Sequence, residues 1–403
     1  MTHDESLIAT IAVGLVYALV GGFIAAKLKL PPLVGYLVAG IGVGPFTPGF
    51  VADPHLAPQL AEIGVMLLMF GVGMHFSLRD LLAVRAVALP GAILQMALAT
   101  ALGAVVCKFW GWSLGAGIVF GLSLSVASTV VLLRALEEMK LLDSHEGRLA
   151  VGWLVVEDLL TVIVLVLLPI FAAPLGGHGL DASHETGGSS IVWSILITLG
   201  KVGLFVALML IVGKRAFSWL LMQVERLQSR ELFTLAVIAL ALGVAYGSAE
   251  LFGVSFALGA FFAGMVINES DSSHRAAKDL QPLQDAFSVL FFVAIGMLFD
   301  PMSFIRHPLQ ILITAAIIIL GKSIIAVGIA VLFRCPCGTA LTVAAALAQI
   351  GEFSFILAGM GLQLGLLPAE GQHCILAGAL ISITLNPLIF RLAARRSTVV
   401  TAP

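Results

Sequence analysis

The sequence predicts an all-α membrane protein that crosses the bilayer many times, and two observations support that prediction. The chain has 403 residues, of which 60% are hydrophobic and only 11% are charged, whereas soluble proteins carry about 25% charged residues. The apolar residues also fall in blocks of about 15 to 25, and a helix of about 20 residues matches the hydrocarbon core of a bilayer. The formal net charge of −2 gives no indication of a nucleic-acid partner.

The apolar blocks predict 13 membrane-spanning helices joined by short polar connections. The first block follows an acidic N-terminus without a basic region, so we expect it to remain as a helix rather than to be removed as a signal peptide. The predicted spans cover residues 8–26, 33–50, 59–76, 87–107, 113–136, 147–171, 191–214, 232–248, 253–268, 285–300, 309–333, 340–362 and 372–393.

The basic residues are distributed unevenly between the two sides of this predicted topology. If the N-terminus lies outside, the inside loops and the C-terminal tail hold 17 Lys and Arg residues, and the outside loops hold Lys108 and Arg306. The remaining two, Lys201 and Lys322, lie within spans. Cytoplasmic loops are enriched in Lys and Arg. The sequence therefore predicts a multi-pass membrane protein with its N-terminus outside and its C-terminus in the cytoplasm.

Two segments of the chain are similar to one another at an offset of 223 residues. Residues 67–78 and 290–301 share four identities in twelve positions, and they fall in the third and tenth predicted spans. Spans that are seven apart cross the membrane in opposite directions, which indicates an inverted-topology repeat of the kind found in secondary transporters. We therefore divide the chain into a first repeat of spans 1–6, a linker with span 7, a second repeat of spans 8–13 and a cytoplasmic tail, at residues 1–171, 172–231, 232–396 and 397–403.

The same offset aligns two polar stretches of small residues inside apolar spans, "SVAST" at 125–129 and "AQIGE" at 348–352. Helices interrupted at matching positions of two repeats are typical of transport sites, because broken helices leave backbone groups and partial charges that can face an ion. The alternative is that Ser and Thr bond back to their own helix and that small residues aid packing. The candidate broken-helix residues are Ser125, Ser128, Thr129, Gln349 and Glu352.

Glu157 and Asp158 are adjacent acidic residues within the apolar sixth span. Asp158 lies about 11 residues into that span, or roughly 16 Å, near the middle of a hydrocarbon core about 30 Å thick. One charged group at that depth costs about 2.5–3.5 kcal/mol on insertion scales, and such residues are candidates for function. We therefore take Asp158 and Glu157 as candidate cation- and proton-binding residues.

The two carboxylates can have different roles, because adjacent residues of a helix point about 100° apart. Lys322, at the centre of the eleventh span, is the expected charge partner of Glu157. Asp158 then remains as the group that binds either a monovalent cation or a proton, since desolvation favours the uncharged form of a carboxyl group. Two alternatives are a purely structural ion pair beside a hydrated Asp158, and a second proton site at Glu157.

Seven motifs follow one another along nearly the whole chain: "PLVGYLVAGIGVGPFTPGF", "GVMLLMFGVGMHFSLRDL", "SVASTVVLLRALEE", "GWLVVEDLL", "FALGAFFAGMVINES", "LFFVAIGMLFDP" and "ALAQIGEFSFIL". In this order they resemble the membrane part of Kef-type monovalent cation/proton antiporters, and most of all the YbaL-like branch. The resemblance implies two inverted six-helix repeats with crossing broken helices, a dimerisation domain and a mobile core domain. It also implies that the essential aspartate of the family is Asp158 and that its core-domain lysine is Lys322.

The resemblance further implies the substrates and partners. We expect a homodimer in membrane lipid that exchanges a monovalent cation, K⁺ in preference to Na⁺, for protons by alternating access, with no cofactor besides these ions. Relatives often continue into a C-terminal nucleotide-binding regulatory domain, which these 403 residues do not contain, so that domain is a further expected partner. Many electrogenic relatives have two aspartates in place of Glu157 and Asp158, so no stoichiometry is implied.

Two rival functions are less compatible with the sequence. A gated K⁺ efflux pathway with channel-like conduction would need a continuous pore, and the sequence contains no "TVGYG"-type filter. An intramembrane aspartyl protease would need two aspartates on different helices, whereas Asp158 is the one aspartate predicted at mid-membrane depth. We therefore expect a transporter rather than an enzyme.

Overall fold

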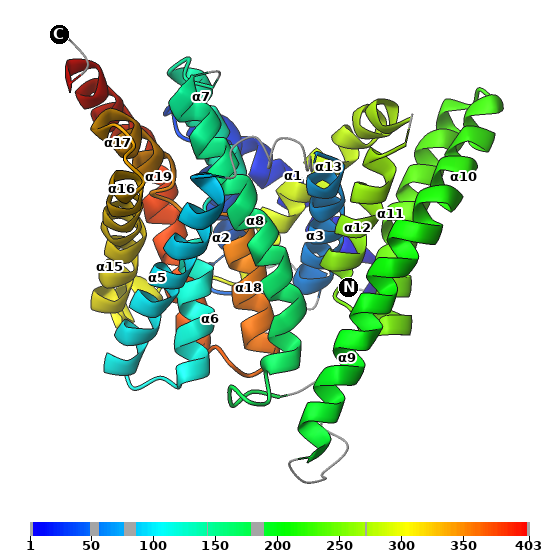
Figure 1. Cartoon of the computed structure of the whole chain (residues 1–403), viewed down its shortest axis with the longest axis horizontal. Coiled ribbons are helices and arrows are strands. Elements are labelled where there is room, and N and C mark those ends of the chain that lie inside the picture. Colours follow the sequence, from blue (N-terminus) through cyan, green and yellow to red (C-terminus); the bar gives the residue numbers. More distant parts are fainter. Residues whose placement is uncertain are drawn as a thin grey trace. The chain divides into compact units, whose positions relative to one another are not determined.

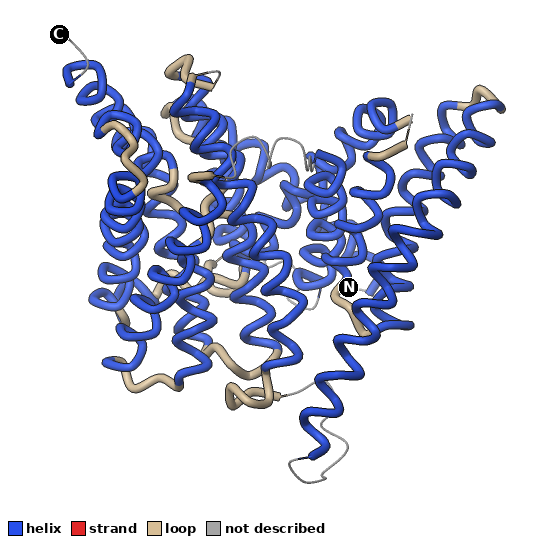
Figure 2. Tube along the Cα trace, in the orientation of Figure 1, coloured by secondary structure: helices blue, strands red, loops and turns tan. Residues whose placement is uncertain are grey.

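The computed structural model describes residues 3–48, 56–75, 86–142, 144–178, 189–270 and 272–400, and every regular element in these ranges is helical (Figures 1 and 2). Within these ranges, eight helices are long and apolar enough to cross a membrane. Four further apolar helices are shorter and cover Pro32–Val43, Pro58–Met74, Phe256–Asn268 and Cys337–Ala346. The chain is therefore an all-helical, multi-pass membrane protein.

The helices differ from the predicted spans mainly at their ends. The second predicted span stops early, because α2 covers only Pro32–Val43. The seventh continues well past residue 214, since α9 (Ser189–Leu208), a π-turn η1 (Met209–Gly213) and α10 (Lys214–Arg226) follow one another without a break. The tenth begins twelve residues earlier than predicted, in the polar first turns of α13 (Ser273–Met297). Apolar blocks indicate the part of a helix that the membrane covers, whereas polar residues extend a helix beyond it.

Contacts divide the chain into two compact units, and neither is a continuous stretch of sequence. Unit 1 comprises Met1–Leu19, Tyr36–Ser77 and Asp181–Leu298, and unit 2 comprises Val20–Gly35, Leu78–Leu180 and Phe299–Pro403. The division falls within α1 (His3–Lys27) and α2. The other elements of unit 1 are α3 (Leu56–His75), α9, η1, α10, α11 (Arg230–Phe252), α12 (Phe256–Asn268) and α13.

In unit 1, α3 and α12 approach each other through glycines. A methyl group added at Gly73 would collide with the carbonyl oxygen of Phe261, and one added at Gly264 would collide with that of Phe70. Small residues allow such close backbone contact between membrane helices, where van der Waals packing replaces the hydrophobic driving force. The α3–α12 contact therefore depends on the absence of a side chain at both glycines.

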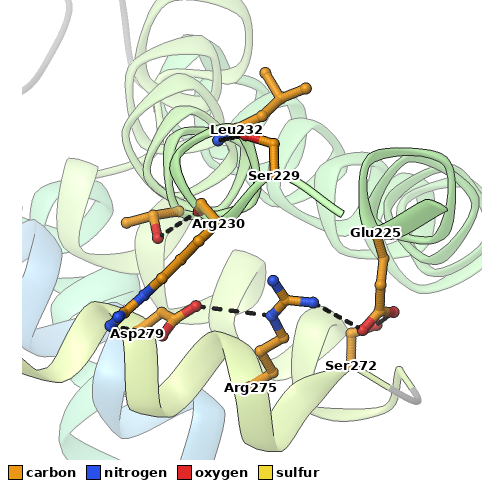
Figure 3. A network of polar contacts seen from close by, with 8 residues as sticks. Glu225, Ser229, Arg230, Leu232, Ser272, Arg275 and Asp279 are labelled. Carbon is orange, nitrogen blue, oxygen red and sulfur yellow. Dashed lines mark hydrogen bonds and ion pairs between the residues drawn. The ribbon is translucent and has the colours of Figure 1, made fainter. Parts of the chain in front are cut away.

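A polar network connects α10, α11 and α13 at one end of unit 1 (Figure 3). Arg275 forms ion pairs with Glu225 at 3.2 Å and Asp279 at 3.8 Å, and Asp279 also pairs with Arg230 at 3.4 Å. The Arg275 guanidinium lies 4.3 Å from the centre of the Phe233 ring. Most of these side chains are partly exposed, so each pair adds little stability. Their joint effect is to hold the ends of three helices together.

Unit 2 contains the two breaks that the sequence predicts within spans. Its first helices are α5 (Ala88–Phe109), α6 (Leu114–Ser125), α7 (Thr129–Glu138) and α8 (His145–Phe171), and its last are α14 (Ser303–Arg306), α15 (Pro308–Ala316), a π-turn η2 (Ile317–Gly321), α16 (Lys322–Leu332), α17 (Cys337–Ala346), α18 (Glu352–Gln363) and α19 (Ala369–Val400). α5 and α6 run side by side (Figure 1), since a methyl group at Gly103 would lie 2.5 Å from the Cα of Gly121. The core includes the fully buried Trp153 of α8, which leaves no room for a side chain at Gly91 of α5.

Substitution of Gly264 by Ala is expected to destabilise the protein by about 1–3 kcal/mol, because the added methyl group overpacks a rigid backbone contact. The measurement is the thermal unfolding of purified protein in detergent. Gly243→Ala on α11 is the matched control, since no atom lies within 4 Å of the added methyl group there. Equal melting temperatures for the two variants would contradict the close α3–α12 contact.

Candidate ion-binding site

The two adjacent carboxylates lie at the middle of α8, which continues without interruption for 27 residues. The Ser144 hydroxyl accepts a hydrogen bond from the Gly147 N–H at 3.0 Å and so caps the start of the helix. Glu157 lies 12 residues after His145, or about 18 Å along the axis. Glu157 is fully buried and Asp158 is 8% exposed. An unbroken helix thus places both acidic groups deep inside unit 2.

The first broken helix consists of α6 and α7, separated by the non-helical residues Val126, Ala127 and Ser128. The hydroxyl of Ser128 accepts a hydrogen bond from the Val131 N–H at 3.4 Å, so it caps the start of α7. The hydroxyl of Ser125 donates to the Leu122 carbonyl of its own helix at 2.7 Å. Of the predicted serines, Ser125 therefore bonds back to α6, whereas Ser128 lies at the break itself.

The second broken helix consists of α17 and α18, with residues 347–351 between them. Its Gly351 is extended and packs against the first break, where a methyl group would lie 2.5 Å from the Cα of Ser128. The hydroxyl of Ser354 donates to the Val126 carbonyl at 3.4 Å. The two interrupted segments, far apart in the sequence, therefore contact each other directly.

Gln349 holds the two breaks together. Its Oε1 accepts a hydrogen bond from the Ser128 N–H at 2.9 Å, and its Nε2 donates to the Ser128 carbonyl at 3.1 Å. Nε2 also donates to the Ala346 carbonyl at the end of α17, at 3.4 Å. A side-chain amide has a donor and an acceptor like those of a peptide group. Gln349 therefore supplies the Ser128 N–H with the acceptor that the missing helical turn would have supplied, and its Nε2 adds a second donor to the Ser128 carbonyl, which also accepts the Leu132 N–H at 3.1 Å.

Asp158 lies beside the start of α7. The hydroxyl of Thr129 donates to Asp158 Oδ2 at 3.1 Å, while Oδ1 has no hydrogen-bond partner in the described part of the chain. Glu352, the first residue of α18, and Glu157 both repel Asp158 electrostatically. Glu352 itself accepts a hydrogen bond from the Ser128 hydroxyl at 3.4 Å. Three buried carboxylates therefore lie close enough to interact, and one oxygen of Asp158 is left without a partner.

Lys322 is fully buried and follows the π-turn η2 directly. Its ammonium group donates to the Gln349 carbonyl at 2.9 Å. Glu157 instead accepts a hydrogen bond from the Ala127 N–H at 3.2 Å. The opposite charges of Glu157 and Lys322 attract each other, but no ion pair within 4.0 Å joins them. The two residues are electrostatic partners at a distance, and each forms its short contact with a backbone group at one of the breaks.

Unit 2 thus contains all eight residues that the sequence predicts for the site. One further residue, Gln95 of α5, was not predicted, although it is fully buried and donates to the carbonyl of Ser125 at 3.4 Å. The available signal was a single Gln in the apolar fourth span. It was missed because the offset of 223 residues aligns the polar stretches of spans 5 and 12 but gives no information on the helices that pack against them.

Comparison with known proteins identifies the family. A family model described as a transmembrane sodium/hydrogen exchanger matches residues 14–396. The chain belongs to the sodium/hydrogen exchanger family. Its members include cation/proton antiporters, which are transporters rather than enzymes.

Individual relatives confirm the resemblance to Kef-type antiporters. The chain is 59% identical to the putative cation/proton antiporter YbaL of Escherichia coli K12, over 97% of this chain and 69% of that protein. It is 33% identical to K(+) efflux antiporter 4 of Arabidopsis thaliana, over 96% of this chain and 64% of that protein. A glutathione-regulated potassium-efflux protein, KefC of Klebsiella pneumoniae, is 28% identical over 92% of this chain and 58% of that protein.

A solved structure has the same fold. The sodium proton antiporter MjNhaP1 of Methanocaldococcus jannaschii superposes with a TM-score of 0.71, over 97% of this chain and 99% of that one. The two sequences are 16% identical. The arrangement of helices is therefore shared despite extensive sequence change.

Substitution of Gln349 by Leu is expected to lower the free energy of unfolding by about 2–4 kcal/mol, because it leaves buried backbone groups of both breaks without partners. Gln363→Leu, at the exposed end of α18, is the matched control. Thermal unfolding in detergent measures both. If the two variants melt at the same temperature, Gln349 does not hold the breaks together in the way that the hydrogen bonds indicate.

Proposed function

We propose that the protein is a secondary active transporter that exchanges a monovalent cation for protons, with Asp158 as the shared binding group. The supporting observation is the unpartnered Oδ1 of Asp158, which lies on a buried side chain next to two broken helices. A carboxylate oxygen in that position can accept either a proton or a cation. Binding of one excludes the other, which is the basis of exchange.

The residues around Asp158 have distinct roles in this proposal. Thr129 orients the carboxylate through Oδ2 and leaves Oδ1 for the ion. Glu352 adds negative charge close to Asp158 and so favours a cation in the site. Ser128 and Gln349 keep the two breaks in contact, while Lys322 compensates part of the acidic charge. Glu157 is the second candidate for proton binding.

K⁺ is the favoured cation and Na⁺ is the second candidate. Relatives named as potassium efflux antiporters align over most of the chain, which favours K⁺. The family description and the solved relative name sodium, which keeps Na⁺ as a substrate to be tested. The chain spans only part of the length of these potassium-efflux relatives, so a regulatory domain such as the resemblance implies remains an expected partner.

The transport cycle that we propose is alternating access in a homodimer embedded in the inner membrane. Two inverted repeats, spans 1–6 and 8–13 of a 13-helix topology, would give the site equivalent routes to the two faces of the membrane. The contact between two helical breaks supports this arrangement, because helices broken at matching positions are typical of inverted-repeat transporters.

Asp158→Asn is expected to abolish cation-driven proton movement, because the amide keeps the size of the side chain but cannot lose a proton. The measurement uses a pH-sensitive dye inside proteoliposomes after addition of K⁺, Na⁺ or neither. Asp279→Asn, in the polar network of unit 1, is the matched control and should retain transport. Normal exchange by Asp158→Asn in sealed vesicles would contradict the assignment of Asp158 as the binding group.

The orientation of the chain is tested by cysteine labelling. Ser183→Cys, in the segment 176–188, should react with an impermeant thiol reagent from the outside of intact cells, whereas Arg226→Cys should react only after the membrane is permeabilised. Both variants are made in a chain whose exposed Cys337 is replaced by Ser. The opposite labelling pattern would reverse the topology and contradict the distribution of Lys and Arg on which it depends.

A further inference from the structure

Lys322 is placed by an unusual turn of its own helix. The π-turn η2 is closed by Lys322 itself, whose N–H donates to the Ile317 carbonyl five residues earlier. A π-turn holds one residue more than a regular α-helical turn, and such turns occur frequently at functional sites. The ammonium group of the same residue donates to the Gln349 carbonyl at 2.9 Å. The π-turn and the contact with the second break therefore meet at one residue.

The extra residue of the π-turn determines the direction in which Lys322 points. Each residue of an α-helix turns the chain by about 100°. If η2 were a regular α-helical turn of the same sequence, α16 would be rotated by that angle relative to α15, and Lys322 would take the half-buried position that Ser323 now occupies. Lys322 is instead fully buried, whereas Leu320 and Ile324 are 61% and 71% exposed. A change of register by one residue would thus move the ammonium group away from the second break.

Ser323 is the side chain that bonds to the π-turn. Its hydroxyl lies 2.6 Å from the Ile319 carbonyl within η2 and 3.4 Å from the Ala344 carbonyl of α17. A serine hydroxyl has one proton to donate, so the two carbonyls share it. The first contact stabilises the wide turn, and the second ties the start of α16 to the helix that ends at the second break. Ser323 therefore links the register of α16 to the position of that break.

The π-turn η1 of unit 1 provides a comparison. It is closed in the same way by Lys214, whose N–H donates to the Met209 carbonyl, and the two turns lead into similar sequences, "IVGK" at 211–214 and "ILGK" at 319–322. Lys214 is partly exposed and pairs with Glu269, and the residue that follows it is Arg215, which has no hydroxyl. A π-turn that ends in Gly-Lys can therefore form without a serine, and the serine is present where the lysine is buried.

We infer that Ser323 is a positioning residue of the ion site: it holds the register of α16 so that Lys322 stays at the second break. This inference rests on the proposed antiport with Asp158 as the binding group. Serines that bond back to their own helix are common, but Ser323 also contacts α17 and directly follows Lys322. If Lys322 is displaced, the acidic groups of the site lose part of their compensating charge and bind protons more tightly.

The experiment measures cation-driven proton movement in proteoliposomes as a function of pH for Ser323→Ala, Ser323→Thr and Thr314→Val. Thr314 is the matched control, because its hydroxyl also donates to a carbonyl four residues earlier, at 2.7 Å, but on α15 and outside the π-turn. Ser323→Ala should shift the midpoint of the pH profile upward by about 0.5 pH unit, the equivalent of one lost hydrogen bond. Ser323→Thr keeps the hydroxyl and should retain the original profile, as should Thr314→Val. An unshifted profile for Ser323→Ala, or an equal shift for Thr314→Val, would overturn the inference.

A double-mutant cycle on the melting temperature in detergent tests the link between Ser323 and Lys322 without transport. Lys322→Met removes the ammonium group and keeps a long side chain. The losses in Ser323→Ala and Lys322→Met should not add in the double variant, because both weaken the same contact with the second break. Additive losses would contradict the inference. If the unmodified protein moves no protons in response to a cation, the proposed antiport fails, and the cycle still decides whether Ser323 positions Lys322. If Lys322→Met does not fold, the pH profiles decide the inference on their own.

Discussion

The arrangement of unit 2 depends on one constraint: backbone groups released by a broken helix inside an apolar interior must find partners. Each unsatisfied N–H or C=O in such an environment costs several kcal/mol. The chain meets this constraint with five side chains: Gln95, Glu157, Lys322 and Asn386 lie on other helices, and Gln349 lies in the second break itself. Each of these residues is fully buried. The polar residues that cost most inside a membrane are thus the ones that make the two breaks possible.

The contact between the breaks also limits which residues can occupy them. Gly351 must lack a side chain because it lies against the backbone of Ser128. Gln349 must be long enough to reach both the N–H and the carbonyl of Ser128. A change at either position would separate the segments and expose groups that no solvent can satisfy. The location of Asp158 beside Thr129 is therefore fixed by packing at the breaks as much as by α8.

The sequence predicted the all-helical membrane fold and the segments of the site, but not the contacts within the site. Apolar blocks of the length of a bilayer and two polar stretches at one offset were sufficient for Ser128, Thr129, Gln349 and Glu352, because a polar residue in such a block has few explanations. The boundaries of α10 and α13 were missed, since helices continue into water where hydropathy gives no signal.

The direct Glu157–Lys322 ion pair was expected from charge alone, and charge does not reveal that nearer backbone groups compete for both residues. Gln95 was missed for a related reason: its role depends on which helix packs against α6, and that is a property of the tertiary structure.

The positions of Glu157 and Lys322 follow the polarity of the backbone at each break. The carboxylate accepts an N–H just before the start of α7, where a helix N-terminus favours negative charge, and the ammonium group donates to a carbonyl that follows the end of α17, where positive charge is favoured. Their mutual attraction adds to these contacts over a longer distance. Among the residues that the structure describes, Lys322 is the one buried ammonium, and it can balance only one of the three carboxylates. Asp158 and Glu352 therefore remain with an excess of acidic charge in the buried interior of unit 2. Such an excess is stable only when protons or a bound cation neutralise it. That requirement, rather than any single contact, is the physical basis of the exchange that we propose for this site.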